Sequence, residues 1–165
     1  MRKNGIIFVL AVAAVLAATS AFAADDLAAK LQAVLAGGAD ARFWQVSADD
    51  VQEMIAGKKT DFVVVDVRPS PEDYKEGHVP GSIFIAPQDM FKPESLAKLP
   101  KNKKIILVCG TGQVQNIPLL GLRALGYDAR TMRFGYTAWI KDYRGGAGMQ
   151  DTIQNASNKN YPLEK

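Results

Sequence analysis

The chain has 165 residues, of which 48% are hydrophobic and 22% charged, with one cysteine and one histidine. This composition is typical of a globular domain and excludes a collagen-like, disordered or disulfide-stapled chain. A single cysteine also excludes an internal disulfide and a metal site built on several thiolates. Because the only histidine is His78, we expect neither a metal centre nor a cofactor.

Residues 1–23 have the organisation of a secretory signal peptide. Two basic residues follow Met1, an uncharged apolar run extends from Ile6 to Ala18, and Ala21-Phe22-Ala23 provides small residues for a signal peptidase. The apolar run has about 13 residues, which is short of the roughly 20 that span a bilayer. We therefore expect cleavage after Ala23 and a periplasmic or secreted protein with no membrane association in its mature form.

The charges that remain after this segment are almost balanced, with 18 Lys and Arg residues against 17 Asp and Glu. No run rich in Lys or Arg is left. The sequence therefore predicts no nucleic-acid partner.

Residues 24–41 are predicted to form an N-terminal helix and linker. The helix runs from Asp25 to Ala36 with its leucines on one face, and Gly37-Gly38 ends it. We interpret this helix as a packing element or a spacer.

Strands and helices then alternate over residues 42–144. Ser47 is a good N-cap for a helix that ends at Ala56, and the two apolar β-branched runs are typical of strands buried on both faces of a parallel sheet. The predicted strands are 43–46, 62–65, 105–108 and 128–134, and the later predicted helices are 117–125 and 137–144. This alternation predicts an α/β domain with a central, mainly parallel sheet and helices on both faces. Residues 145–165 are rich in Gly, Asn and Gln, which indicates a loop or tail.

The chemistry is predicted at Cys109, which directly follows a buried strand and precedes the turn Gly110-Thr111-Gly112. In open α/β sheets, ligands bind at this carboxyl edge. The two glycines allow successive backbone N–H groups to curl around an anion, and the same dipoles favour a thiolate over a thiol. The alternative is a buried packing cysteine, but the position favours a reactive thiol.

Several short motifs follow one another in a characteristic order. They are Asp66-Val67-Arg68, Tyr74, Gly77-His78-Val79-Pro80-Gly81-Ser82-Ile83, the strand ending in Cys109, Gly126-Tyr127, and Gly135-Tyr136-Thr137-Ala138-Trp139. In order and spacing, this set resembles the rhodanese-like sulfurtransferase family over about residues 42–144. We expect an exported, single-domain member.

The resemblance implies a three-layer α/β domain and persulfide chemistry. The Cys109 thiolate would take a sulfane sulfur from a small donor, hold it as Cys–S–S⁻ and pass it to a thiol acceptor or another nucleophile. Backbone N–H groups of the loop would stabilise this anion without a metal or cofactor. The expected substrate-binding residues of the loop are Gly110, Thr111, Gly112, Gln113 and Val114.

Two departures from the family bear on the substrate. Many relatives end the six-residue loop with Arg, where this chain has Val114, and the loop contains no Lys or Arg. Because thiosulfate is a dianion, we expect polysulfide to be favoured over thiosulfate as the donor. Phe134 also replaces the usual first glycine of the closing motif.

Three residues outside the loop complete the candidate site. Asp66 ends the first buried strand and is interpreted as structural support for the loop. Two roles stay open for Arg68, which pairs with Asp66 or Glu72, or else faces the cleft as a substrate-binding cation. His78 is interpreted as a structural hydrogen-bonding residue rather than a base.

Other chemistries are disfavoured. A phosphatase of the Cys-x5-Arg type requires Arg where this chain has Gln115, and the same residue interrupts a dinucleotide-binding glycine pattern. A Cys–His hydrolase would need a third, orienting group, and the sequence shows no sign of one. The remaining alternative is a non-catalytic rhodanese-like module that binds a sulfur species or a partner protein.

The signal peptide gives a first prediction. When the full chain is expressed in a bacterium, the exported protein begins at Ala24, because the small residues before it fit the peptidase. N-terminal sequencing of the soluble periplasmic fraction checks this, and an intact Met1 in that fraction would contradict export.

Overall fold

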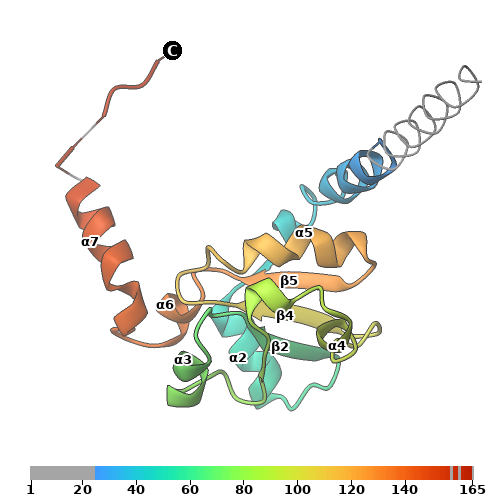
Figure 1. Ribbon diagram of the computed structural model, residues 1–165. Helices are drawn as coiled ribbons and strands as arrows, with labels where there is room; N and C mark the ends of the chain where they lie inside the picture. The colour runs from blue at the N-terminus through green and yellow to red at the C-terminus, as the bar shows by residue number, and fades with distance from the viewer. Residues whose placement is uncertain (1–24, 157, 160, 165) are drawn as a thin grey trace, which may run out of the picture.

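The computed structural model describes residues 25–156, 158–159 and 161–164, so the predicted signal peptide lies outside the described residues. The core of the protein is a five-stranded parallel sheet in the order β1-β5-β4-β2-β3 (Figure 1). Its strands are β1 (Gln45–Val46), β2 (Phe62–Asp66), β3 (Ile83–Phe84), β4 (Lys104–Val108) and β5 (Asp128–Met132).

The two apolar runs form neighbouring strands near the centre of the sheet. Val65 of β2 pairs with Leu107 of β4, and Asp66 pairs with Val108. Burial on both faces explains why these strands read as continuous apolar segments. Because the strands are parallel, the chain leaves both at the same edge, which places Asp66 beside the residue that precedes Cys109.

Helices cover both faces of the sheet and give the three layers. One core cluster packs α5 (Asn116–Ala124) and α4 (Pro93–Leu96) against the sheet, and the other packs α2 (Ala48–Ala56) and α6 (Tyr136–Trp139) against the opposite face. The remaining helical segments are α3 (Pro71–Glu76), α7 (Ala147–Ala156), η1 (Arg42–Trp44), η2 (Pro87–Asp89) and η3 (Arg144–Gly146). The α/β fold predicted from the alternation is confirmed.

Local capping explains where α2 begins. The Ser47 side chain accepts a hydrogen bond from the Asp50 N–H at 3.0 Å, and Asp50 in turn accepts one from the Ser47 N–H at 2.9 Å. This reciprocal pair satisfies two N–H groups that a helix start leaves free. The hydrogen bonds also lower the pKa of Asp50, the Ser47 side chain contributing most.

Three local expectations were wrong. The predicted strand 43–46 is reduced to two residues, because Arg42, Phe43 and Trp44 take left-handed backbone angles in η1. The predicted helix 137–144 stops at Trp139, where Ile140 becomes extended. The predicted C-terminal loop instead contains α7, whose interior holds one glycine among residues that tolerate a helix.

The two terminal helices extend away from the body of the domain (Figure 1). Residues 25–36 are helical and the chain turns at residue 37, while α7 contacts mainly η3. No helix within the described residues is long and apolar enough to cross a membrane.

The turn after β5 packs closely against the end of β4. Gly135 has a φ of +53°, and a Cβ atom there would overlap the Cys109 carbonyl oxygen. That oxygen accepts a hydrogen bond from the Tyr136 N–H at 2.8 Å. Only glycine meets both the left-handed backbone and the close approach.

Substitution of Gly135 tests this constraint. Gly135→Ala lowers the free energy of unfolding by at least about 3 kcal/mol, because it adds backbone strain to an overlap with Cys109. Urea denaturation measures the change. Gly148→Ala is the matched control, since no atom lies within 4 Å of its Cβ position. This substitution raises the free energy of unfolding by about 1 kcal/mol or less.

Candidate active site

Cys109 begins a loop that extends to Val114 between the ends of β4, β2 and β5. Its side chain is 1% exposed and belongs to the core cluster that contains Val67 and Leu119. Val114 packs against the same cluster, so the last residue of the loop is an apolar packing residue.

The hydrogen bonds around the loop use the carbonyl groups of residues 109, 110, 112 and 113 as acceptors. The carbonyls of Cys109 and Gly110 accept from the N–H groups of Tyr136 and Thr137 at 2.8 and 3.1 Å. The Asn116 side chain donates to the carbonyls of Gly112 and Gln113 at 2.7 and 3.2 Å.

Among the described residues, no protein acceptor bonds the N–H groups of 110–114. Five consecutive N–H groups beside a cysteine, followed by the start of α5, are therefore available as donors to an anion.

Gln115 is a site residue that the sequence analysis did not assign. Its side chain is 1% exposed and lies between two strand ends. Its Oε1 accepts from the Cys109 N–H at 2.9 Å, and its Nε2 donates to the Met132 carbonyl at 2.6 Å. Gln115 therefore fixes the start of the loop to the end of β5.

A buried ion pair supports the neighbouring strand end. The Arg68 guanidinium donates to both carboxylate oxygens of Asp66, with Nη2–Oδ2 at 2.7 Å, and also to the Gly77 carbonyl at 2.7 Å. The Tyr136 hydroxyl donates to Asp66 at 2.9 Å and accepts from the Val79 N–H at 2.9 Å. Asp66, Arg68 and Tyr136 are all at most 4% exposed.

The electrostatics follow from this arrangement. Burial opposes the charge of Arg68, but hydrogen bonds to Asp66 and Tyr143 outweigh it and raise the pKa of Arg68 above its usual value. Burial, together with the charge of Asp66, also raises the pKa of Tyr136. The hydroxyl of Tyr136 therefore keeps its proton and acts as a donor to Asp66.

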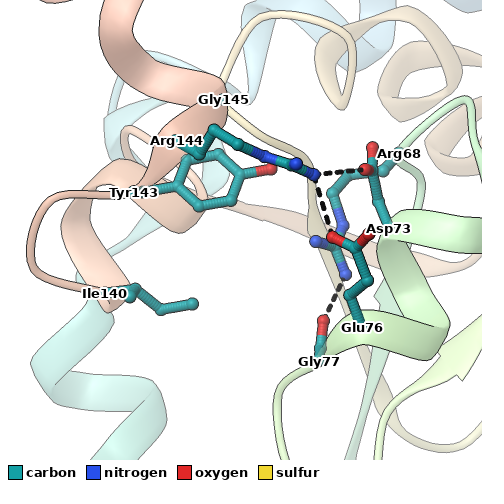
Figure 2. A pocket seen from close by; sticks show the side chains of 8 residues that line it. All are labelled: Arg68, Asp73, Glu76, Gly77, Ile140, Tyr143, Arg144 and Gly145. Atoms are coloured by element: carbon teal, nitrogen blue, oxygen red, sulfur yellow. Dashed lines mark hydrogen bonds and ion pairs between the residues drawn. The ribbon is translucent and has the colours of Figure 1, made fainter.

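A pocket of about 240 Å³ lies beside Arg68. It is lined by residues of α3 and of the segment around Tyr143 (Figure 2). Arg144 closes one side through ion pairs with Glu76 at 2.9 Å and Asp73 at 4.0 Å. The Tyr143 ring lies 3.5 Å from the position of a Cβ atom on Gly110. Tyr143 therefore lies in contact range of the loop at Gly110.

A second pocket of about 280 Å³ lies beside the loop itself. Thr111, Gly112 and Gln113 form part of its lining, together with Arg133 and Phe134. The pocket has one cationic residue among its lining residues, Arg133.

His78 lies on the surface, away from the core. Its ring stacks on Tyr74 with centroids 3.9 Å apart, and its Nδ1 lies 2.8 Å from the Tyr74 carbonyl oxygen. These contacts are local to α3 and the turn after it. Of the residues expected outside the loop, the structure thus brings Asp66 and Arg68 together and holds His78 in a turn.

The hydroxyl of Tyr136 and the ring of Tyr143 were not identified from the sequence either. Tyr136 lies inside the closing motif, but nothing local shows that its hydroxyl reaches Asp66, 70 positions away. Within the described residues, no three His, Cys, Asp or Glu side chains gather as a metal site would require.

A parallel five-stranded sheet with a cysteine loop at its carboxyl edge matches known proteins. Residues 47–142 match the family model described as Rhodanese-like domain. The chain therefore belongs to the rhodanese-like family, a family of sulfurtransferases.

Two solved structures share the fold. A rhodanese-like domain protein from Staphylococcus aureus is 24% identical with a TM-score of 0.53, covering 59% of this chain and 92% of that one. A rhodanese-related protein from Thermoplasma volcanium is 24% identical with a TM-score of 0.50, covering 58% and 88%.

A curated relative is also similar in sequence. A tRNA sulfurtransferase from Desulfurococcus amylolyticus is 33% identical over 86 residues, which are 52% of this chain. The match spans only 16% of that protein's length, so the similarity concerns one part of a much longer chain.

The buried ion pair gives a prediction for stability. Arg68→Met lowers the free energy of unfolding by about 3–5 kcal/mol, because it leaves the Asp66 carboxylate buried without its partner. Urea denaturation measures this loss. Lys104→Met removes the exposed pair with Asp61 and is the control, with a cost of about 1 kcal/mol or less. Equal losses in the two variants would contradict the role given to Arg68.

Proposed function

We propose that this protein is a periplasmic sulfurtransferase that carries sulfane sulfur as a persulfide on Cys109 and passes it to a thiol or another nucleophile. The observation that supports this most directly is the free N–H groups of 110–114 next to the only cysteine of the chain. A persulfide is an anion, and preorganised backbone dipoles stabilise it at no further reorganisation cost. No cofactor is required for this chemistry.

The loading step is a nucleophilic displacement. The Cys109 thiolate attacks a terminal sulfur of a polysulfide, the new bond forms between Sγ and that sulfur, and the adjacent S–S bond breaks. The shortened polysulfide leaves with the electron pair, and Cys109 becomes Cys–S–S⁻. In the second step an acceptor thiolate attacks the outer sulfur, and Cys109 leaves as a thiolate.

The charge around the loop favours polysulfide over thiosulfate as the donor. The loop has no Lys or Arg, and the guanidinium of Arg68 is hydrogen-bonded to Asp66 and Gly77. Thiosulfate carries both of its charges in one compact group, whereas a polysulfide chain carries one at each end. A thiosulfate dianion at the loop would therefore meet N–H dipoles without a guanidinium from the loop itself to match its second charge, since Arg133 belongs to the adjoining pocket. One missing charged hydrogen bond amounts to about 1.5–3 kcal/mol, or roughly 10- to 150-fold in rate.

One observation favours the second candidate, a non-catalytic module that binds a sulfur species or a partner protein. Cys109 is only 1% exposed, so a donor reaches Sγ only when the surrounding side chains move. In such a module the loop would bind an anion without forming a bond to Cys109.

Mass spectrometry separates the two functions. Wild-type protein exposed to polysulfide gains about 32 Da at Cys109, the mass of one sulfur, and it loads at least about 10-fold more slowly with thiosulfate. Cys109→Ser gains no mass and keeps its fold by circular dichroism, because Ser differs little in volume.

The same mass measurements include a control variant and can also give results that contradict the proposal. Thr111→Ser alters the loop without removing the thiol and still loads. A wild-type protein that binds polysulfide without any mass gain would support the non-catalytic module. Equal loading by the two donors would contradict the account of the loop charge.

A further inference from the structure

Phe134, the residue after Arg133 in the turn that follows β5, combines two unfavourable features. Its backbone φ is +62°, in the left-handed region that bulky residues rarely adopt. Its side chain is also 61% exposed. A phenylalanine here thus gains little from burial and adopts a backbone conformation that glycine would adopt without strain.

The surrounding contacts explain why the backbone cannot relax. The Gly135 N–H donates to the Met132 carbonyl at 3.0 Å, and the Thr137 hydroxyl donates to the Phe134 carbonyl. A Cβ on Gly112 would lie 2.8 Å from the Phe134 nitrogen, so this backbone is packed directly against the cysteine loop. The position of the loop therefore imposes the left-handed angle.

A second phenylalanine in the chain also has a positive φ, but its ring has a packing partner. Phe43 has a φ of +50° and is 54% exposed, but its ring meets the edge of Trp44 with centroids 6.5 Å apart. Phe134 belongs to neither core cluster and to no aromatic pair among the described residues. Backbone strain that is not offset by packing of the side chain is typical of a residue with a functional role.

Phe134 lies in a pocket that adjoins the cysteine loop. Phe134 lines the pocket of about 280 Å³ together with Thr111, Gly112 and Gln113 of the loop, and Met149 and Arg133 add a second apolar side chain and a cation. The other lining residues, Gln45, Gln115, Asn116 and Thr131, are uncharged and polar. Two apolar side chains and one cation among polar groups fit a small organic molecule that has an apolar group and a carboxylate.

We propose that Phe134 is a specificity-determining residue whose ring contacts the body of the sulfur acceptor, a small organic thiol with an apolar group and a carboxylate. This proposal rests on the persulfide function proposed above. The acceptor thiolate attacks the outer sulfur of Cys109–S–S⁻, the bond to Sγ breaks, and Cys109 keeps the electron pair as a thiolate. The acceptor leaves as its own persulfide, so one sulfur is transferred and no further oxidant or reductant is needed.

The test compares Phe134→Gly with two further variants. Lys58→Gly is the matched control, because Lys58 has a φ of +50°, is exposed and lies after α2. Phe134→Tyr keeps the ring and the strain. Relief of strain raises Tm by about 2–4 °C in both glycine variants and leaves the tyrosine variant near wild type.

Acceptor specificity is measured on sulfur-loaded protein. The ratio of transfer rates to mercaptobenzoate and to mercaptoethanol falls about 3- to 10-fold in Phe134→Gly, the size expected for the loss of one aromatic contact. It is unchanged in Lys58→Gly and in Phe134→Tyr. An unchanged or higher ratio in Phe134→Gly overturns the proposal, and so does a lower Tm, which would show that the ring stabilises the fold.

A second reaction keeps this test independent of sulfur loading. Reduced Cys109 is treated with dithiobis(nitrobenzoate), an aromatic carboxylate disulfide, and with the small reagent methyl methanethiosulfonate. If the ring guides aromatic carboxylates to the loop, the rate with dithiobis(nitrobenzoate) divided by the rate with methyl methanethiosulfonate falls about 3- to 10-fold in Phe134→Gly. Failure of wild-type protein to load with sulfur would refute the persulfide function. An unchanged reagent ratio in Phe134→Gly would refute the role proposed for the Phe134 ring, whether or not the protein loads with sulfur.

Discussion

The buried pair of Asp66 and Arg68 is the interaction on which the edge of the sheet depends. It closes the end of β2, reaches the turn after α3 through the Gly77 carbonyl, and meets α6 through the Tyr136 hydroxyl. Three segments that are far apart in the sequence therefore meet at one carboxylate. Because the Asp66 carboxylate accepts from both Arg68 and Tyr136 in a buried setting, loss of Arg68 leaves an uncompensated charge.

The cysteine loop is held from the other side by backbone contacts with the end of β5. Gly135 lies against the Cys109 carbonyl, Gly112 faces the Phe134 backbone, and Gln115 joins Cys109 to Met132. The polar groups used for these contacts are mainly carbonyls. Residues 110–114 thus contribute acceptors to the packing of the loop, and their N–H groups remain available for the anion proposed above.

Much of the fold could be predicted because burial leaves a local pattern. The apolar runs of β2 and β4 and the Ser47 cap are visible in a few adjacent residues, and the position of Cys109 follows from the end of its strand. Two roles were open for Arg68, and the structure shows the pairing with Asp66, while Glu72 pairs instead with Lys75 and Ser70. The roles of Gln115 and Tyr136 could not be predicted, because their partners are fixed only by tertiary packing. The helix α7 was missed because glycine and asparagine suggest a loop, although one glycine costs a helix only about 1 kcal/mol.

The packing of the loop also decides where its charge could change during divergence or design. Gly110 is covered by Tyr143, Gly112 requires a left-handed backbone with φ +83° against Phe134, and Val114 packs on the core. Gln113 is the exposed side chain of the loop. A lineage that gained a preference for compact dianionic donors such as thiosulfate would therefore acquire its cation most easily at position 113, because there the new side chain displaces water rather than protein.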